Sequence, residues 1–510
     1  MPENTLSRRT LLRTSGALAA VTAAGCLGSE DEENTIRIGS PWTPDSLDPL
    51  TGGSYLKRMG ITETLVDADY DAEIAPGLAT SWSTDDATTW TFELKPDVSF
   101  HDGSTLDSEA VAGSLERAVD SPGLADLPIV DIRTPAERRL EIELERPFTP
   151  LLAHLTRPET AILQPTAIDD DGVDEPVSTG PFAFDSWTPE TSVTAVKHDA
   201  YHGPEPSLET VVYEGIHDSN TRLLKLQNGE LDMARILSAS TIDTLESDEE
   251  LAAHTYPIPR SRYVVFDTDS EPFDDVRVRR AVLHAIDREE VTDTLLDGET
   301  DVALGPFPSS VTHWANEDLE PYEFDPDTAA SLLADAGWET ESSGAVRRRD
   351  GTPLEIDIWT YSSRPVLPQI ATVIQEQLRT VGIDVSVATM EPGAITERTQ
   401  SGEFDAFIWS NSVLWYPDPD RLADFFHSTE TVMHSGYDNP AVDRLLETGR
   451  ETVDRDERKQ LYDEIQEIVH EDLPIAFLTD YTNVHGTTAD VDGYRPHPIE
   501  STYGLESVSI

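Results

Sequence analysis

Six short segments of the chain are rich in apolar residues, and most of them alternate between apolar and polar positions. Alternation with a period of two places every second side chain on the same face, which is typical of a β-strand with one buried face. We therefore predict strands at residues 36–39, 89–94, 140–144, 354–358, 383–387 and 404–409.

Longer segments between these strands repeat their apolar residues every three to four positions. Within residues 107–119, Val111, Leu115 and Val119 fall on one helical face, and Asp107 stands where an N-cap accepts backbone N–H groups. The same pattern predicts helices at residues 276–285, 327–336, 367–381 and 455–470.

The helix expected at residues 367–381 lies between the strands expected at 354–358 and 383–387. A strand–helix–strand unit of this kind favours a parallel pair, so the sequence predicts an α/β fold. The length of 510 residues exceeds what one hydrophobic core usually serves, which indicates two or three domains or a discontinuous arrangement. A hydrophobic fraction of 38% is enough for globular cores and argues against wholesale disorder.

Acidic residues dominate the composition. Asp and Glu number 98 against 36 Lys and Arg, and the formal net charge is −62. A phosphate backbone needs a basic face, so general nucleic-acid binding is excluded, and docking to anionic lipid is disfavoured. Lysine occurs only five times, and the acids are spread along the whole chain, which favours adaptation to very high salt, where the Debye length falls to roughly 3 Å.

The N-terminus carries export signals. Arg8 and Arg9 precede a short apolar stretch at residues 16–24 and then Cys26, the only cysteine. We predict a twin-arginine signal with a lipobox over residues 1–25, a lipid on Cys26 and an acidic tether over residues 26–34. In the alternative, Cys26 is merely a small residue of the signal. A single cysteine permits no intrachain disulfide and no thiolate metal cluster.

Several phrases then occur in a fixed order. They include Ile74–Trp82, Val98–Gly103, Ser178–Phe182 and Pro272–Ala281. Together they resemble the family 5 extracellular solute-binding proteins, the dipeptide, oligopeptide and nickel receptors of ABC importers. The resemblance runs from about residue 36 to residue 480. Most of these phrases are scaffold: Asp102-Gly103 is a turn signal, and His101 has no spaced partner ligand nearby.

The resemblance implies a two-lobed fold of the periplasmic-binding-protein type (type II, discontinuous lobes) with an extra inserted domain and a ligand enclosed between the lobes. Mapped onto this chain, the first lobe takes residues 35–52, 178–258 and 478–510, the inserted domain 53–177, and the second lobe 259–477. It further implies a monomeric, lipid-anchored receptor at the extracellular face of the cytoplasmic membrane. Its partners would be an ABC permease with cytoplasmic ATPases and a small solute, a peptide first; no cofactor is expected.

Two of the expected ligand-binding segments are short loops. The early loop contributes Gly53, Ser54 and Tyr55, which in the family reach the cleft. The second segment follows the strand expected at 354–358, where α/β sheets place their ligands, and contributes Tyr361 and Arg364. In the dipeptide receptors an arginine in this stretch pairs with the peptide carboxylate, and the alternative for Arg364 is a surface ion pair.

The third segment contributes Trp409, Asn411, Trp415, Tyr416 and Asp418. Peptide receptors keep here an Asp that binds the ligand's ammonium group, but this chain has no acid between residues 409 and 417. The aromatic residues suggest stacking walls instead, with core packing as the alternative.

Other ligands and other classes of protein stay open. His434 stands where nickel receptors keep a His, but one imidazole holds a metal only when a chelator supplies the other ligands. A sugar or metal-chelate receptor, an exported hydrolase and an orphan signalling receptor are the alternatives. The chain lacks a Gly-x-Ser-x-Gly elbow, a His-Glu-x-x-His motif and a phosphate loop, so nothing proposes an enzyme.

Overall fold

The computed structural model describes residues 34–169, 172–342, 345–364 and 366–510. The chain divides into two units at Glu33, and the fold below is that of residues 34–510. The predicted signal, tether and lipidated Cys26 lie outside the described residues, except for Asn34 at the end of the tether.

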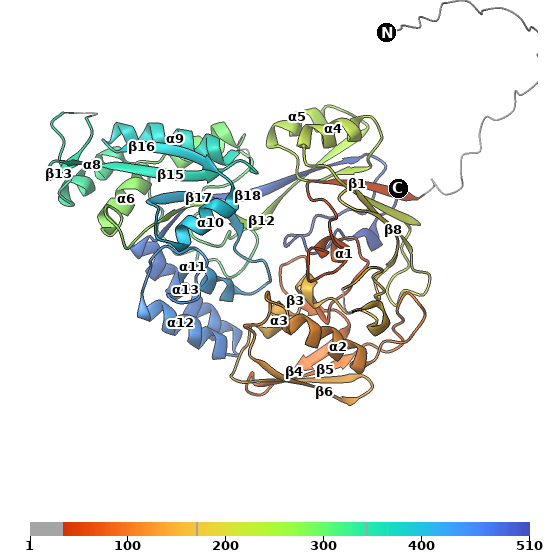
Figure 1. Cartoon of the computed structure of the whole chain (residues 1–510). Coiled ribbons are helices and arrows are strands. Elements are labelled where there is room, and N and C mark those ends of the chain that lie inside the picture. Colours follow the sequence, from red (N-terminus) through yellow and green to blue (C-terminus); the bar gives the residue numbers. More distant parts are fainter. Residues whose placement is uncertain (1–33, 170–171, 343–344, 365) are drawn as a thin grey trace, which may run out of the picture. The chain divides into compact units, whose positions relative to one another are not determined.

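A ten-stranded mixed sheet runs through this unit, in the order β16-β15-β17-β12-β18-β11-β1-β10-β9-β8 (Figure 1). Its centre is formed by two long antiparallel strands, β12 (Leu251–Phe266) and β18 (Ile475–Thr488). One end of β12 pairs with β17 (Ala406–Ser412), and the opposite end of β18 pairs with β11 (Met233–Ala234). The two strands therefore belong to both halves of the sheet and connect them.

The pairing of β12 with β18 is irregular near its middle. The register shifts between Ile258 and Ser261 and again between Arg262 and Tyr263. A bulge of this kind bends a strand and increases its twist. The irregularity lies where the two halves of the sheet meet.

Residues of the first lobe build one half of this sheet and their own core. Its strands and helices are β1 (Thr35–Ser40), α1 (Ser54–Arg58), β8 (Phe182–Thr188), β9 (Ser192–Lys197), β10 (Thr210–Gly215), α4 (Ser219–Gln227) and α5 (Ile242–Glu246). Tyr55, Leu56, Met59 and Ile61 are buried in this core. These residues were expected at the start of the inserted domain, so its core begins about ten residues later than the boundary at 53.

The inserted domain has a sheet and a core of its own, which draws on residues 65–162. Four antiparallel strands lie in the order β4-β5-β7-β6, and α2 packs against them (Figure 1). As predicted, Asp107 caps α2 by accepting the backbone N–H of Ala110, and Val111 and Leu115 are buried. Its elements are β2 (Val66–Ala68), β3 (Ile74–Pro76), β4 (Ala79–Ser83), β5 (Thr89–Leu94), α2 (Ser108–Val119), β6 (Ile129–Ala136), β7 (Arg139–Leu144) and α3 (Leu151–His154).

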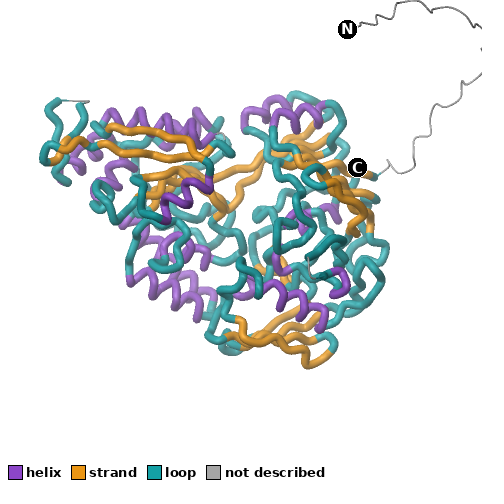
Figure 2. Tube along the Cα trace, in the orientation of Figure 1, coloured by secondary structure: helices purple, strands orange, loops and turns teal. Residues whose placement is uncertain are grey.

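The second lobe contains the predicted strand–helix–strand unit. β15 (Glu355–Tyr361) and β16 (Asp384–Met390) pair in parallel, with α9 (Val366–Thr380) between them in sequence, which confirms the prediction. Helices flank this half of the sheet and also form a separate layer below it (Figure 2). They are α6 (Val276–His284), α7 (Arg288–Glu290), α8 (Pro326–Asp335), α10 (Pro392–Gln400), α11 (Ala423–Phe426), α12 (Pro440–Glu451) and α13 (Arg455–Asp472), and the hairpin of β13 (Arg348–Arg349) and β14 (Thr352–Pro353) lies beside α8.

No helix in the described part of the chain has both the length and the apolar character that a bilayer crossing demands.

Candidate functional site

The two central strands bring basic residues together where the lobes meet. Arg260 and Arg262 lie two positions apart on β12, so their side chains leave the strand on the same side. Both reach Tyr481 on β18: the guanidinium carbon lies 4.1 Å from the ring centroid for Arg262 and 5.8 Å for Arg260. The irregular middle of the strand pair therefore presents two cations around one phenol ring.

Arg364, predicted as a ligand contact, joins the same group. It follows β15, its guanidinium lies 5.4 Å from the Tyr481 ring, and it donates a 3.0 Å hydrogen bond to the phenol oxygen. We call Arg260, Arg262, Arg364 and Tyr481 the unpaired arginine cluster, because none of the three arginines forms an ion pair with any described carboxylate.

Neutral groups are the partners of these guanidinium groups. Arg260 donates to the carbonyl of Ser410 at 3.2 Å. Arg262 donates to the Thr479 hydroxyl at 3.0 Å and to the Asp480 carbonyl at 2.7 Å, while its buried Nε has no partner in the described structure.

The concentration of positive charge shows in the pKa values. Burial of the Tyr481 phenol raises its pKa, but Arg364, Arg262 and Arg260 together outweigh burial and hold the pKa below its usual value. Burial and the neighbouring Arg364 lower the pKa of Arg260 to about 10. All three arginines still carry their charge at neutral pH.

The first lobe adds a second pair of arginines with one acid between them. Arg235 forms a 3.0 Å ion pair with Glu500, and Nε of Arg58 donates to the Glu500 carbonyl at 3.0 Å. Both guanidinium groups lie over Trp42, at 4.9 Å for Arg58 and 5.7 Å for Arg235. Burial alone would raise the pKa of Glu500, but four nearby arginines lower it by more, so the pKa lies below its usual value and the carboxylate stays ionised. These arginines are Arg235, Arg58, Arg260 and Arg364.

A small cleft joins the two groups. It holds about 270 Å³ of empty space, partly open to solvent, between residues of both lobes. Trp415, which is 39% exposed, forms part of its wall. The complete lining is Arg58, Ile258, Pro259, Arg260, Ser412, Trp415, Pro498, Ile499 and Glu500.

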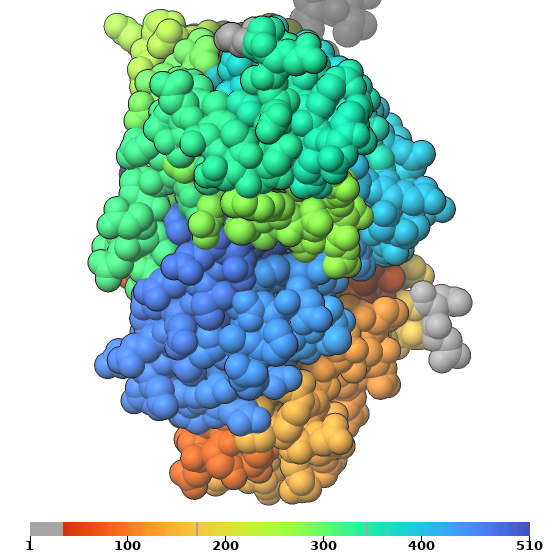
Figure 3. Space-filling model, turned by 90° about the vertical axis from the view of Figure 1, so that its left-hand side faces the viewer, coloured from red at the N-terminus to blue at the C-terminus, as the bar shows by residue number. Residues whose placement is uncertain are grey.

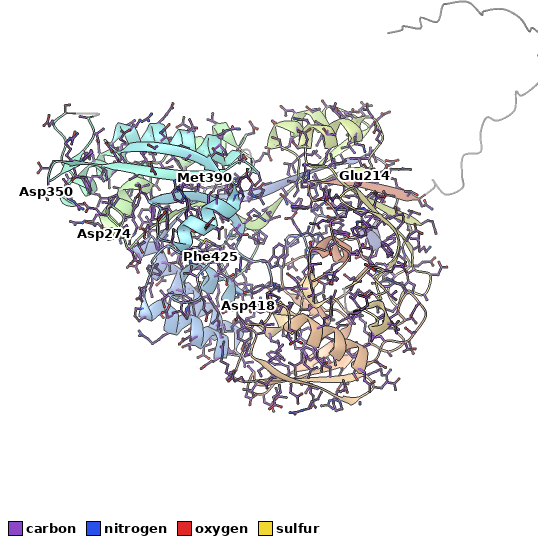
Figure 4. The ribbon with its side chains drawn as sticks, in the orientation of Figure 1. Glu214, Asp274, Asp350, Met390, Asp418 and Phe425 are labelled. Atoms are coloured by element: carbon purple, nitrogen blue, oxygen red, sulfur yellow. The ribbon has the colours of Figure 1, made fainter. Side chains whose placement is uncertain are left out.

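Asp418, predicted as a polar handle for the ligand, is occupied by the protein itself. It receives two hydrogen bonds from Arg458, at 2.8 and 2.9 Å, and also accepts the backbone N–H of Asp420 at 2.9 Å. Arg450 likewise pairs with Asp420 at 2.6 Å and with Glu430 at 2.7 Å. We call these five residues the paired arginine cluster; Asp418 lies where the second lobe faces the inserted domain (Figure 4).

The second lobe touches the inserted domain beside this cluster. The backbone N–H of Thr149 donates to the Arg450 carbonyl at 2.7 Å, and the ring of His154 lies 4.2 Å from that of Tyr416. Figure 3 shows the surface of the C-terminal helices directly against that of the inserted domain. Tyr416, expected to be a wall of the ligand site, is 5% exposed and packs against the inserted domain.

Three of the other expected site residues of the second lobe belong to its sheet. Tyr361 is 5% exposed, packs 4.5 Å from the Trp409 ring and donates to the Ser410 carbonyl at 3.2 Å. The Asn411 side chain accepts the N–H of Ser412 at 2.9 Å. These contacts match the core-packing alternative for Trp409.

The early loop packs into the first lobe. Gly53 precedes α1, where an added Cβ would meet the Asp48 backbone at 2.9 Å, and the next residue, Ser54, begins the helix. Tyr55 is buried, stacks on Tyr213 and donates to the Ser46 carbonyl at 2.6 Å. Arg58, one turn further along, is the residue of this segment that lines the cleft.

His434 does not join other ligands. No group of three or more His, Cys, Asp or Glu side chains among the described residues is arranged to hold a metal ion.

Comparison with known proteins agrees with the geometry. The family model for bacterial extracellular solute-binding proteins, family 5, matches residues 73–432. The chain belongs to this family. Its members are solute receptors rather than enzymes, and they have the two-lobed fold that the sequence predicted.

Relatives and solved structures cover nearly the whole chain. The glutathione-binding protein GsiB of Pectobacterium atrosepticum is 27% identical over 99% of both chains. The nickel ABC transporter structure from Bacillus halodurans is 30% identical, with a TM-score of 0.81 over 94% of this chain and 100% of that one. NikA from Brucella suis in complex with Fe(III)-EDTA is 26% identical, with a TM-score of 0.86 over 93% and 99%.

Of the predicted site residues, Trp415 lines the cleft and Arg364 lies beside it in the unpaired arginine cluster. The lining residues Arg58, Arg260 and Glu500 were not predicted. A signal was present for one of them. In a chain with few basic residues, two arginines alternate at positions 260 and 262 directly before the apolar run Tyr263–Phe266. Burying a cation on a strand that enters the core costs free energy unless the cation is paired, so such a residue suggests a binding site for an anion.

Proposed function

We propose that the chain is the lipid-anchored substrate-binding component of an ABC importer, which captures a small solute outside the cell and delivers it to a membrane permease driven by cytoplasmic ATPases. The observation that supports this most is the cleft at the crossing of β12 and β18, which is lined from both lobes. The protein would act as a monomer at the extracellular face of the cytoplasmic membrane.

The two long strands suit a closing motion. Because β12 and β18 are the strands shared by both lobes, a change in their twist near the register shift at Ile258 and Ser261 would swing one lobe towards the other. Contacts such as Thr149 with Arg450 would then form only in the closed form.

A peptide is the first candidate for the solute. Relatives include the oligopeptide-binding protein AppA of Bacillus subtilis and the dipeptide-binding protein of Escherichia coli. Arg364 would bind the carboxylate of a peptide, since a guanidinium group can hold a carboxylate through two parallel hydrogen bonds. Asp418 is unsuited to an ammonium group because Arg458 already binds both of its oxygens.

A metal chelate is the second candidate. One structural relative holds Fe(III)-EDTA, a chelate whose outer groups are carboxylates, and another relative is a nickel-binding protein of Escherichia coli. Here Arg260 and Arg364 would contact the chelator while the metal keeps the ligands that it arrived with.

Identification of the ligand tests the receptor function. The protein is isolated gently in molar KCl, unfolded, and the released small molecules are identified by mass spectrometry. We expect one solute in near-stoichiometric amount. If none is released, and neither peptides nor chelates bind in calorimetry, the receptor function fails.

The lipid anchor is tested separately through Cys26. Cys26→Ser should release the protein from the membrane fraction into the medium and leave solute binding unchanged. If the variant stays in the membrane fraction to the same extent, the anchor is disproved while the receptor function stands.

A further inference from the structure

Positive charge is concentrated around the cleft in a chain that is otherwise strongly acidic. Arg58, Arg235, Arg260, Arg262 and Arg364 all act on one another, on Tyr481 or on Glu500. Two acids act on these five cations: Glu500, which Arg235 pairs directly, and Asp480, which acts on Arg262 without forming an ion pair and whose pKa is raised by burial. The chain has 98 acids and 36 bases, so the shortage of acids here is a property of this site and not of the composition.

An isolated charge in such surroundings is costly. Arg262 is 5% exposed, and its Nε has no hydrogen-bond partner in the described structure. Buried charges in proteins are normally paired, because an unpaired one loses its hydration without compensation. An anion that enters the cleft would supply the ion pairs that these arginines lack.

The cluster is built so that its donors are held in place. The Tyr481 ring lies among three guanidinium groups, and its hydroxyl accepts the hydrogen bond of Arg364. Contacts between guanidinium groups and an aromatic face fix the planes of the arginines before a ligand arrives. Fixed, planar donors suit carboxylates, which accept two parallel hydrogen bonds.

A second anchor lies across the same cleft. Arg58 lines it from the first lobe, opposite Arg260 and Trp415. Its Nε is taken by the Glu500 carbonyl, and the carboxylate of Glu500 is paired by Arg235. The Arg58 charge therefore faces the cleft without an acid of its own among the described ion pairs.

We propose that the solute carries at least two anionic groups, of which Arg260 and Arg364 bind one and Arg58 binds the other, with Trp415 against the part between them. This inference rests on the proposed receptor function and names its class of substrate. Two sources share this chemistry: a peptide with an acidic side chain and a free C-terminus, and a metal chelate that presents several carboxylates.

The test uses the protein freed of its solute by exhaustive dialysis in KCl at constant ionic strength. Four probes are titrated by calorimetry: the peptide Ala-Ala-Glu, its neutral-ended analogue Ala-Ala-Gln-amide, citrate, and citrate loaded with Ni²⁺. We expect at least one of the anionic probes to bind ten times more tightly than the amide. Preference for Ala-Ala-Glu indicates the peptide source, and preference for nickel citrate indicates the chelate.

Three variants locate the effect. R260Q and R364Q should each weaken binding of the preferred anionic probe by about tenfold to a hundredfold, as expected for the loss of a charge-assisted hydrogen bond. Arg348→Gln is the matched control, because Arg348 is exposed in the β13–β14 hairpin and its guanidinium group donates to the Gly351 carbonyl, away from the cleft lining. Its affinity should equal that of the unchanged protein.

Each contrary result overturns a different statement. If the amide binds as well as the anions, if no anion binds, or if R260Q and R364Q keep full affinity, the anionic class is wrong. If the solute released from the native protein is neutral or cationic, the class is also wrong, although the receptor function survives. Only the absence of any bound solute, together with failure of all four probes, removes both.

Discussion

The two arginine clusters of this protein use the same residue in opposite ways. In the paired cluster, Arg458 and Arg450 are both buried, and each meets carboxylates at hydrogen-bond distance. In the unpaired cluster, Arg262 is equally buried but meets only neutral oxygens and a phenol ring. The chain has acids in excess, so the lack of ion pairs to the described arginines around Tyr481 is the informative feature.

The difference in pairing distinguishes arginines that stabilise the fold from arginines that we expect to bind the ligand. A cation whose acid comes from the same chain joins two parts of the protein: Arg450 and Arg458 connect α12 and α13 to the loop that follows β17. We infer that a buried cation without an acid of its own marks the place where an anionic ligand binds.

A substitution in the paired cluster should destabilise the protein strongly, whereas a substitution in the unpaired cluster should destabilise it only slightly. Asp418→Asn leaves the buried Arg458 without its acid, so we expect a loss of about 3–5 kcal/mol in the free energy of unfolding. Arg260→Gln removes a cation that has no ion pair, and we expect a loss below about 1 kcal/mol. Denaturant unfolding of both variants in molar KCl measures the contrast, and equal losses would abolish it.

Asp480 is the acid whose charge acts on the unpaired cluster from the side of β18. Burial, with a contribution from Asp301, raises its pKa to about 7. Because the folded pKa lies above that of an unfolded aspartate, the folded state holds a proton that the unfolded state loses. Stability should therefore fall as pH rises from about 4 to about 7 and stay level above that.

The size of this effect is a few kcal/mol, since each unit of pKa shift corresponds to about 1.4 kcal/mol. Asp480→Asn should remove this part of the pH dependence and stabilise the protein at pH 8 more than at pH 5. Melting curves of both proteins across this range measure the difference. A parallel pH dependence in the variant would show that Asp480 is already ionised and that Arg262 does have an acid.

The sequence predicted local structure well, because local structure depends on neighbours in the chain. The cap at Asp107 and the parallel pair of β15 and β16 are examples. The fate of Asp418 could not be predicted in the same way, since its partner Arg458 lies forty residues further along on another helix. From sequence alone, a polar loop residue suggests a ligand contact, because a partner from a distant part of the chain is not visible.

The site itself depends on even longer separations. Arg260 and Tyr481 meet through the pairing of β12 with β18, which the sequence did not reveal because Pro257 and Pro259 interrupt the apolar pattern of β12. Trp415 and Arg364 were predicted as ligand contacts because the family resemblance marks their loops. That no described carboxylate forms an ion pair with Arg260, Arg262 or Arg364 is visible only in three dimensions.

Trp415 should behave as a part of the unpaired side. It is 39% exposed at the cleft, so Trp415→Ala removes ligand contacts and little core. We expect a loss of about 2 kcal/mol in binding, or about thirtyfold in affinity, with the melting temperature nearly unchanged. Calorimetry with the co-purified solute and melting curves of the same variant give both numbers. A large drop in stability with full affinity would place Trp415 in the core.

The smallest effect is expected at the contact between the inserted domain and the second lobe. Glu73 of the inserted domain lies 2.7 Å from His313 and 2.5 Å from Arg455 of the second lobe. Arg455 is 56% exposed, and exposed ion pairs contribute at most about 1 kcal/mol. If the pair forms only when the lobes are closed, Glu73→Gln should weaken solute binding two- to fivefold without changing stability.

Glu93→Gln is the control, because Glu93 pairs with Arg139 inside the inserted domain at 3.7 Å and should leave affinity unchanged. A loss of affinity confined to Glu73→Gln would show that closing the lobes is part of binding. Equal affinities of the two variants would show that this contact is present in the open form as well.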